Sequence, residues 1–112
     1  MKSSDPAFKA FESMQWGYRA MFVLLHTYRV RNGCNTLREM ISRYAPPAEN
    51  HTENYIRAVA TQAQVSSDEI LDTRNGKVMI PVVAAMSRVE NGIPAQMDEV
   101  RAGWDLFIKY PV

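Results

Sequence analysis

The chain has 112 residues, the size of one domain, and this length is enough to build a hydrophobic core. Hydrophobic residues make up 46% and charged residues 22%, which excludes extensive disorder, and a single cysteine excludes an intramolecular disulfide. The net charge is only +1. A domain that neutralises many phosphates normally has a large basic excess, so we expect no binding to duplex nucleic acid.

Residues 1–12 are predicted to form an extended lead-in to a single helical domain over residues 13–108. The N-terminal segment has no apolar run typical of a signal peptide. The longest apolar stretch, residues 20–25, is too short to span a bilayer. We therefore expect a chain that is cytoplasmic as synthesised and has no membrane span.

The first predicted helix spans residues 14–31, with Ser13 in the N-cap position. Apolar residues cover two sectors of this helix, which is too broad for a surface helix. The sectors are Met14, Tyr18, Met21, Leu25 and Tyr28, and then Trp16, Ala20, Val23 and Leu24. We predict that it is the central helix, packed on most sides and ended by Gly33. Cys34 follows and is predicted to be a small buried hydrophobe.

The next two helices have recognisable boundaries. Thr36 and Glu39 have the spacing of a capping box, and Pro46 and Pro47 must end the helix that it starts. Thr52 is the predicted N-cap of the third helix. The apolar stripes are Leu37, Met40, Ile41 and Tyr44 in the second helix and Ile56, Val59, Ala60 and Ala63 in the third.

A polar connector over residues 65–76 leads to a fourth helical segment, residues 77–91. Pro81 lies in its first turn or kinks it, and its β-branched residues would also suit a strand. The last predicted helix covers residues 96–108 and buries Met97, Val100, Trp104, Phe107 and Ile108. The pattern predicts an all-α fold of one compact domain, with about five helices around a central helix.

The sequence contains no glycine-rich phosphate loop, no paired cysteines and no histidine pair at metal-ligand spacing. We therefore predict no metal site and no cofactor. His26 lies on an apolar helix and is predicted to be a hydrogen-bonded core or boundary residue rather than a ligand or base. His51 is predicted to be exposed in a loop.

Two prolines stiffen the loop between the second and third helices, which then presents Glu49, Asn50, His51 and Thr52. Function often resides on such a loop when rigid helices hold it. Alternatively, its acceptors only stabilise the N-terminus of the next helix. The aromatic residues that flank the loop are candidates for stacking on a ligand, with a core position as the alternative. These aromatic residues are Tyr44 and Tyr55.

Glu90, Asn91 and Gly92 form a second polar cluster at the end of the fourth segment. A glutamate in the last turn of a helix opposes the helix dipole, and a residue that breaks a local rule can have another role. A solvated carboxylate at a helix end is the alternative. Glu49 and Glu90 are therefore the candidate catalytic pair, and the candidate ligand-binding residues are Tyr44, Asn50, His51, Thr52, Tyr55 and Asn91.

Motifs along the chain resemble those of phage and prophage virion structural proteins. The likeness covers about residues 8–106, and its most specific part is Ala-Pro-Pro-x-Glu-Asn-x-Thr at residues 45–52, followed by Glu-Asn-Gly at residues 90–92. Further matching segments are residues 11–13, 17–20, 27–28, 35–37, 41–44, 55–56 and 59–60. The chain also resembles copies of this type in gut anaerobes, which implies an origin in a prophage or mobile element.

The helical domain of this family is similar to lysozyme-like cell-wall hydrolases. The resemblance therefore implies a lysozyme-like helical half, association with a virion and contact with peptidoglycan. Longer members carry an Arg-Asn-x-Asn-Pro segment ahead of the equivalent of Phe8, which is missing here. His51 replaces a commoner asparagine or aspartate, and Val89 replaces a histidine that often precedes the glutamate. These departures favour glycan binding without cleavage.

Three functions follow as hypotheses. The first is a phage-derived structural or binding module that contacts cell-wall glycan or another virion protein. The second is a peptidoglycan glycosidase, with Glu49 as acid and Glu90 as base or stabiliser. Retaining chemistry needs carboxyl groups roughly 5 Å apart and inverting chemistry roughly 6.5–9.5 Å. The third is a helical adaptor or regulator. The sequence does not indicate an oligomeric state.

Overall fold

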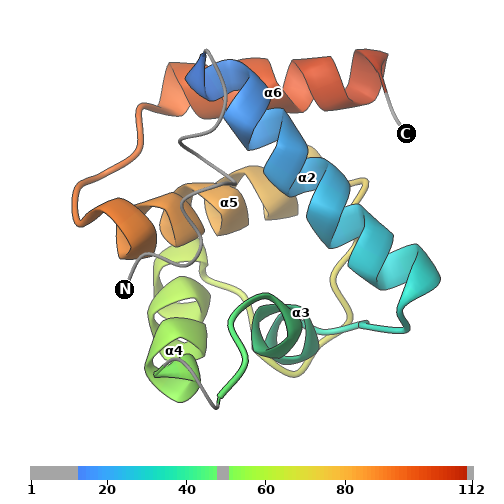
Figure 1. Ribbon diagram of the computed structural model, residues 1–112, viewed down its shortest axis with the longest axis vertical. Helices are drawn as coiled ribbons and strands as arrows, with labels where there is room; N and C mark the ends of the chain where they lie inside the picture. Colours follow the sequence, from blue (N-terminus) through green and yellow to red (C-terminus); the bar gives the residue numbers. More distant parts are fainter. Residues whose placement is uncertain (1–12, 48–50, 111–112) are drawn as a thin grey trace.

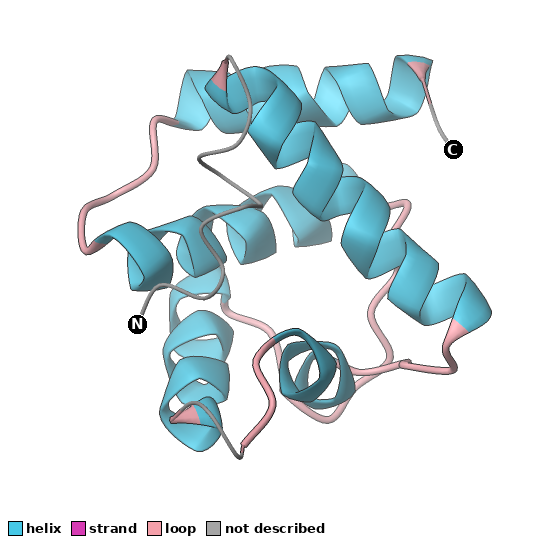
Figure 2. Ribbon diagram, in the orientation of Figure 1, coloured by secondary structure: helices cyan, strands magenta, loops and turns pink. Residues whose placement is uncertain are grey.

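The computed structural model describes residues 13–47 and 51–110, and this part of the chain folds into a single globule (Figure 1). Its helices are α2 (Met14–Arg31), α3 (Leu37–Tyr44), α4 (Thr52–Ala63), α5 (Gly76–Asn91) and α6 (Met97–Lys109). Among the residues described, loops join the helices and no strand is drawn (Figure 2). The predicted all-α fold is confirmed. The predicted lead-in, residues 1–12, lies outside the described residues.

Helix α2 runs diagonally across the molecule and packs most extensively on α6, with further contacts to α5 and α3 (Figure 1). Helix α4 packs on α5 and on α3. The core lies where these helices meet, because each contributes one apolar face to it. The largest fully buried side chains are Tyr18, Met21, Phe22, Leu25, Leu37, Met40, Ile41, Ile56, Met79, Met86 and Phe107.

Helix α2 is buried along one face rather than on most sides. This face consists of Gly17, Tyr18, Met21, Phe22 and Leu25. On the rest of the helix, Trp16 is 44% exposed and Val30 is 59% exposed. The sequence therefore overestimated the packing of this helix. An apolar side chain on a helix can remain at the surface when no neighbouring helix crosses that side.

The predicted helix boundaries in the first half of the chain are confirmed. Ser13 accepts a hydrogen bond from the amide of Trp16, and Gly33 has a φ of +68°, the left-handed conformation of a C′ glycine. Thr36 and Glu39 form both hydrogen bonds of the capping box. Helix α3 then ends at Tyr44, ahead of the two prolines.

The prediction for Thr52 is wrong. His51 is the N-cap residue of α4 and makes no capping hydrogen bond through its side chain, whereas Thr52 is the first helical residue. The Thr52 hydroxyl instead donates to the carbonyl oxygen of Ala45 at 2.5 Å, and both residues are buried. The Thr52 hydroxyl therefore makes a tertiary hydrogen bond to the end of α3 instead of the capping hydrogen bond that the sequence predicted.

The fourth segment is helical, so its β-branched residues do not form a strand. Asn75 caps α5 through its side chain, and Pro81 is the sixth residue, just beyond the first turn. Gly92 ends the helix with a φ of +78°. Helix α6 is shifted by one residue from its predicted range, and Ile108, predicted to be buried, is 48% exposed.

Helices α2 and α6 approach each other closely at Gly103. A Cβ atom at this position would lie 2.6 Å from the Tyr18 Cβ and 2.9 Å from the Gln15 carbonyl oxygen. Next to this contact, the Phe22 ring meets Trp104 edge-on at 5.0 Å between centroids. Trp104 thus packs on the core as predicted. Within the described residues, no helix is long and apolar enough to cross a membrane.

Candidate functional site

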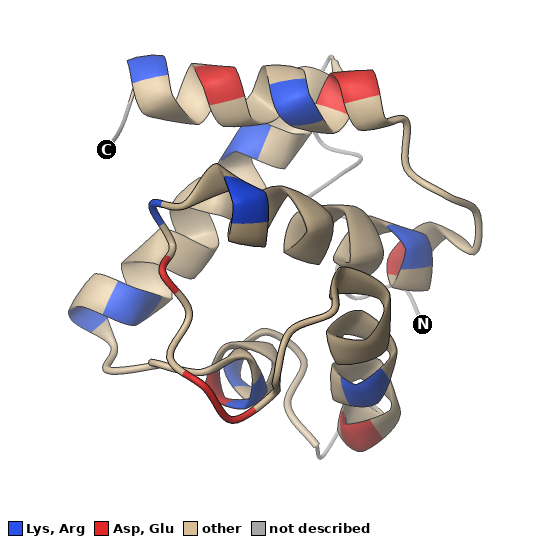
Figure 3. Ribbon diagram, turned by 180° about the vertical axis from the view of Figure 1, so that it is seen from behind, with Lys and Arg blue, Asp and Glu red and all other residues tan. Residues whose placement is uncertain are grey.

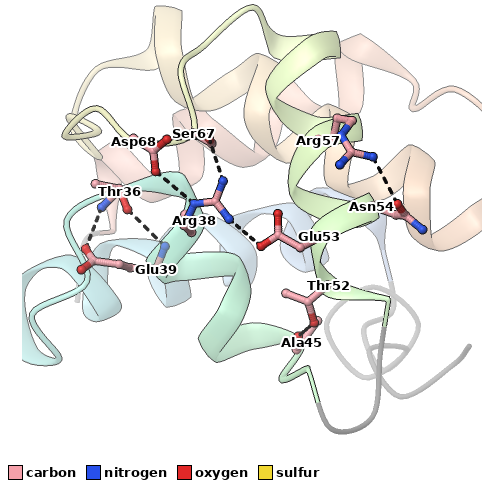
Figure 4. Close-up of polar contacts among 10 residues, drawn as sticks. All are labelled: Thr36, Arg38, Glu39, Ala45, Thr52, Glu53, Asn54, Arg57, Ser67 and Asp68. Carbon is pink, nitrogen blue, oxygen red and sulfur yellow. Dashed lines mark hydrogen bonds and ion pairs between the residues drawn. The ribbon is translucent and has the colours of Figure 1, made fainter.

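Helix α3 and the start of α4 meet at a corner, and Arg38, in the first turn of α3, forms polar contacts across it (Figure 4). Its guanidinium group donates to Glu53 at 2.5 Å and to Asp68 at 3.0 Å, and also contacts the hydroxyl of Ser67. One side chain of α3 therefore binds the first turn of α4 and the connector that leads to α5. These acidic partners raise the pKa of Arg38, with Asp68 contributing most.

The same corner contains a pocket of about 410 Å³, which we call the α3–α4 pocket. Its lining residues are Ser42, Pro47, His51, Thr52, Glu53 and Asn54. They offer hydroxyl, imidazole, carboxylate and carboxamide groups, so the pocket presents both donors and acceptors of hydrogen bonds. Its volume falls in the range of small-molecule sites, roughly 300–1,000 Å³.

Tyr44, Tyr55 and Glu90 form a second cluster, contributed by α3, α4 and α5. The rings of Tyr44 and Tyr55 meet edge-on with centroids 6.3 Å apart. Tyr55 is only 4% exposed, and burial, followed by the nearby charge of Glu90, raises the pKa of its hydroxyl. The half-buried carboxyl of Glu90 therefore lies beside a neutral phenol at neutral pH.

Asn91 belongs to a hydrogen-bond network next to this cluster. Its side-chain amide donates to the hydroxyl of Ser87 at 3.2 Å, and Ser87 shares a hydrogen bond of 2.9 Å with the hydroxyl of Tyr18. Ser87 is almost fully buried, so the network satisfies a polar group inside the core. It also joins the C-terminal turn of α5 to α2 and fixes the backbone beside Glu90.

The structure brings several predicted site residues together and separates them into two groups. His51 and Thr52 line the α3–α4 pocket, whereas Tyr44, Tyr55 and Glu90 form the second cluster. Asn91, the residue after Glu90, is bonded to Ser87. Glu49 and Asn50 lie outside the described residues, so the Glu49–Glu90 pair stays a prediction.

Sequence reasoning missed four residues of the pocket, although a signal for three of them exists. Glu53 and Asn54 follow the predicted cap directly and must lie in the first turn of α4, beside His51. Pro47 was assigned only a stiffening role. Nothing in the sequence pairs Ser42 with α4, because that contact depends on how the two helices cross.

The other polar candidates behave as expected from the sequence. His26 is partly buried and its Nδ1 lies 2.8 Å from the Thr73 hydroxyl, and His51 is exposed, so both predictions are confirmed. Cys34 is buried, as predicted. Across residues 13–47 and 51–110, no group of three His, Cys, Asp or Glu side chains is arranged to hold a metal ion.

Comparison with known proteins shows that the chain is similar to a phage protein. No protein-family model matches it. It is 36% identical over 102 residues to "Protein P5" of Pseudoalteromonas phage PM2, a match that covers 90% of this chain and 62% of P5. The chain thus spans less than two thirds of the length of P5. This similarity supports the prediction that the chain is related to a phage protein.

Proposed function

We propose that the chain is a phage- or prophage-derived structural module that binds cell-wall glycan in the α3–α4 pocket. The similarity to a phage protein supports the origin, and the composition of the pocket supports the ligand. The observation that carries the proposal is a pocket of about 410 Å³ whose lining combines four kinds of polar group (hydroxyl, imidazole, carboxylate and carboxamide) with one proline ring.

A sugar ring presents hydroxyl groups that both donate and accept hydrogen bonds, so its binding site needs both kinds of partner. The hydroxyl of Ser42 and the amide of Asn54 provide both, and Glu53 provides acceptors. Pro47 offers an apolar surface for the carbon face of the ring. The ion pair between Arg38 and Glu53 holds one wall in place, which reduces the entropy lost on binding.

Another virion protein is the alternative occupant of this site. The buried core of a protein interface is normally apolar and depleted of charged groups. Five of the six residues that line the α3–α4 pocket carry a polar side chain, and Glu53 is charged. This composition favours glycan over a protein partner.

Sedimentation with insoluble peptidoglycan tests the proposal. We expect the protein to pellet with the cell wall, and His51→Ala and Asn54→Ala should each weaken binding by about fivefold, the value of one hydrogen bond. Thr61→Ala is the matched control, because Thr61 is exposed on α4 and does not line the α3–α4 pocket. Absence of sedimentation, or equal loss in the control, would contradict glycan binding at this pocket.

A peptidoglycan glycosidase is the second candidate function, favoured by the environment of Glu90. Glycoside hydrolysis usually needs two carboxyl groups, and the surroundings of each group set whether it acts as acid, base or stabiliser. Glu90 is half-buried beside the phenol of Tyr55. In this hypothesis Glu49 is the acid and Glu90 is the base or stabiliser, a pairing that rests on the sequence alone.

Loss of turbidity of a cell-wall suspension separates an enzyme from a binding module. If the chain is an enzyme, Glu49→Gln and Glu90→Gln should abolish clearing while sedimentation persists, and Glu69→Gln, an exposed control, should clear normally. No clearing by the native protein would leave binding as the function. The third hypothesis, a helical adaptor, predicts neither sedimentation nor clearing.

A further inference from the structure

Another pocket, of about 320 Å³, lies between the C-terminal half of α2 and the connector that leads to α5; we call it the connector pocket. Its lining residues are His26, Arg29, Val30, Ile70, Leu71, Asp72, Thr73 and Arg74. None of them lines the α3–α4 pocket or belongs to the Tyr44–Tyr55–Glu90 cluster. The proposed function therefore makes no use of the connector pocket.

The connector pocket has an excess of positive charge. Arg29 and Arg74 both lie close enough to His26 for their charges to lower its pKa, although burial contributes more. In the described part of the chain, all ion pairs belong to Arg38, so neither of these arginines is neutralised by a carboxylate. The one acidic residue in the lining, Asp72, accepts a hydrogen bond from the backbone amide of Arg74 at 3.0 Å.

Basic positions appear on the C-terminal part of α2 and again where the connector enters α5, with an acidic position on the connector between them (Figure 3). Two cationic groups that converge on one pocket attract an anion more strongly than either does alone. Arginine in particular matches a carboxylate, because its planar guanidinium group can donate two parallel hydrogen bonds.

The rim of the pocket is aliphatic. Val30 is 59% exposed and Ile70 is 67% exposed, and both line the pocket, one from α2 and the other from the connector. Exposed aliphatic side chains on both sides of a charged pocket favour a ligand that carries an apolar group beside its charge. A simple inorganic anion would leave both of them in water.

The connector wall is held in a defined position. The Leu71 amide donates to the carbonyl oxygen of Asn35 at 2.8 Å, and Ile70 forms an isolated antiparallel bridge with Thr36. On the other side of the pocket, the His26 ring is hydrogen-bonded to the Thr73 hydroxyl and meets the Phe107 ring edge-on. A pocket whose walls are already ordered loses little entropy when a ligand binds.

We propose that the connector pocket binds an acidic segment of a partner protein, in which a glutamate or aspartate lies beside an aliphatic residue. Arg29 and Arg74 hold the carboxylate, and Val30 and Ile70 contact the aliphatic side chain. The charges are complementary, because the ligand supplies the carboxylate that both arginines lack within the described part of the chain. This interaction does not depend on glycan binding.

Three blocked peptides test this proposal by titration of isotope-labelled protein, followed by NMR at low salt. The first is acetyl-isoleucyl-glutamyl-leucinamide, the second replaces its glutamate by glutamine, and the third replaces both aliphatic residues by glycine. We expect saturable shifts of the amides of residues 70–74 with the first peptide. Binding of the other two should be at least about fivefold weaker, since each lacks one of the two contacts.

Single substitutions locate the binding. Arg74→Gln and Arg29→Gln should each weaken binding of the first peptide by about fivefold or more. Arg31→Gln, in the same last turn of α2 as Arg29, should leave binding unchanged. Arg74 is exposed on the connector, so its substitution should leave the fold intact. On binding, the pKa of His26 should rise, because the carboxylate offsets the charges of the two arginines.

Other outcomes overturn the proposal. If the glutamine peptide bound as tightly as the first peptide, the contact would be purely apolar. If the glycine peptide bound as tightly, the contact would be only a non-specific attraction between charges. Inorganic phosphate that binds as tightly as the first peptide would identify an anion site rather than a peptide site. Shifts confined to other residues, or no shifts, would also contradict the proposal.

Discussion

Two helix pairs in this molecule are held together by different kinds of contact. Helices α2 and α6 meet through apolar surfaces, with Gly103 of α6 placed against the backbone of α2 and Phe22 packed on Trp104. Helices α3 and α4 also share an apolar contact, between the rings of Tyr44 and Tyr55, but polar contacts join them as well. Arg38 binds Glu53, and Thr52 binds the carbonyl oxygen of Ala45. The first pair excludes water, whereas the second keeps polar groups accessible beside a pocket.

The difference shows how a small domain can use one region for stability and another for binding. Close apolar packing supplies most of the free energy of folding but leaves no room for a ligand. Hydrogen bonds and exposed ion pairs supply less free energy, yet they position side chains that can still bind other molecules. The α3–α4 corner is therefore the place where we expect binding, and the α2–α6 interface is the place where we expect the largest effects on stability.

Gly103→Ala tests the α2–α6 interface and should have the largest effect. The new methyl group would lie 2.6 Å from the Tyr18 Cβ and 3.0 Å from the Arg19 amide nitrogen, so the two helices must separate. We expect a loss of about 3 kcal/mol in the free energy of unfolding, measured by urea denaturation. Ala102→Gly at the neighbouring helical position should cost only about 1 kcal/mol. A neutral Gly103→Ala would show that the helices are not in close contact.

Thr52→Val tests the buried hydrogen bond of the α3–α4 corner. The substitution keeps the shape of the side chain but leaves the Ala45 carbonyl oxygen without its hydroxyl donor. We expect a loss of about 2 kcal/mol in the free energy of unfolding. Thr52→Ser retains the donor and should cost about 1 kcal/mol, because only one methyl group is removed. Equal losses in the two variants would mean that the hydrogen bond contributes little.

His26 links the α2–α6 interface to the connector, because its ring touches Phe107 of α6 and its Nδ1 is hydrogen-bonded to Thr73 of the connector. Its pKa is lowered in the folded protein by burial and by the charges of Arg74 and Arg29. His26 therefore takes up a proton more readily in the unfolded chain than in the folded protein. The contribution of His26 to stability should be complete above about pH 6.5 and decrease as the pH falls below that value.

An NMR titration of the His26 ring checks this pH dependence. The midpoint should lie below about 6.5, and Arg74→Gln should raise it, because one of the two neighbouring charges is removed. Arg31→Gln is the control and should leave the midpoint unchanged. A midpoint at or above the reference value would contradict the effects of burial and of the two arginine charges on His26.

Arg38→Gln should have the smallest effect on stability. Its ion pairs with Glu53 and Asp68 are exposed, so solvent and salt screen them. We expect a small fall in melting temperature at low salt that disappears at high salt. Arg57→Gln is the control, since Arg57 is exposed and makes only a long contact of 3.4 Å to Asn54. A large effect of Arg38→Gln that persists in salt would mean that the corner is less exposed than its geometry shows.

Much of the fold could be predicted because its signals are local. The capping box of Thr36 and Glu39, the glycines after α2 and α5, and the two prolines after α3 act within a few residues of their own position. The predictions for Thr52 and Ile108 failed for a different reason. Whether a side chain caps a helix, bonds a distant carbonyl or remains exposed depends on which elements come close to it.

The candidate site was predictable in part. Proximity along the chain placed His51 and Thr52 at one loop, and the unusual position of Glu90 at a helix end marked it as a candidate. The sequence could not show that Glu90 lies beside Tyr55, because α4 and α5 are separated by the whole connector. The contacts of Arg38 and the approach of Gly103 to α2 were not predicted either.

The sequence by itself determined where helices begin and end and which face of each is apolar, because capping and periodicity depend on neighbours within about one turn. Only the tertiary structure decided which polar groups meet. Crossing helices set those distances, and the crossing follows from packing the whole core at once. For that reason the two pockets could not be identified until α2, α3, α4 and the connector were placed together.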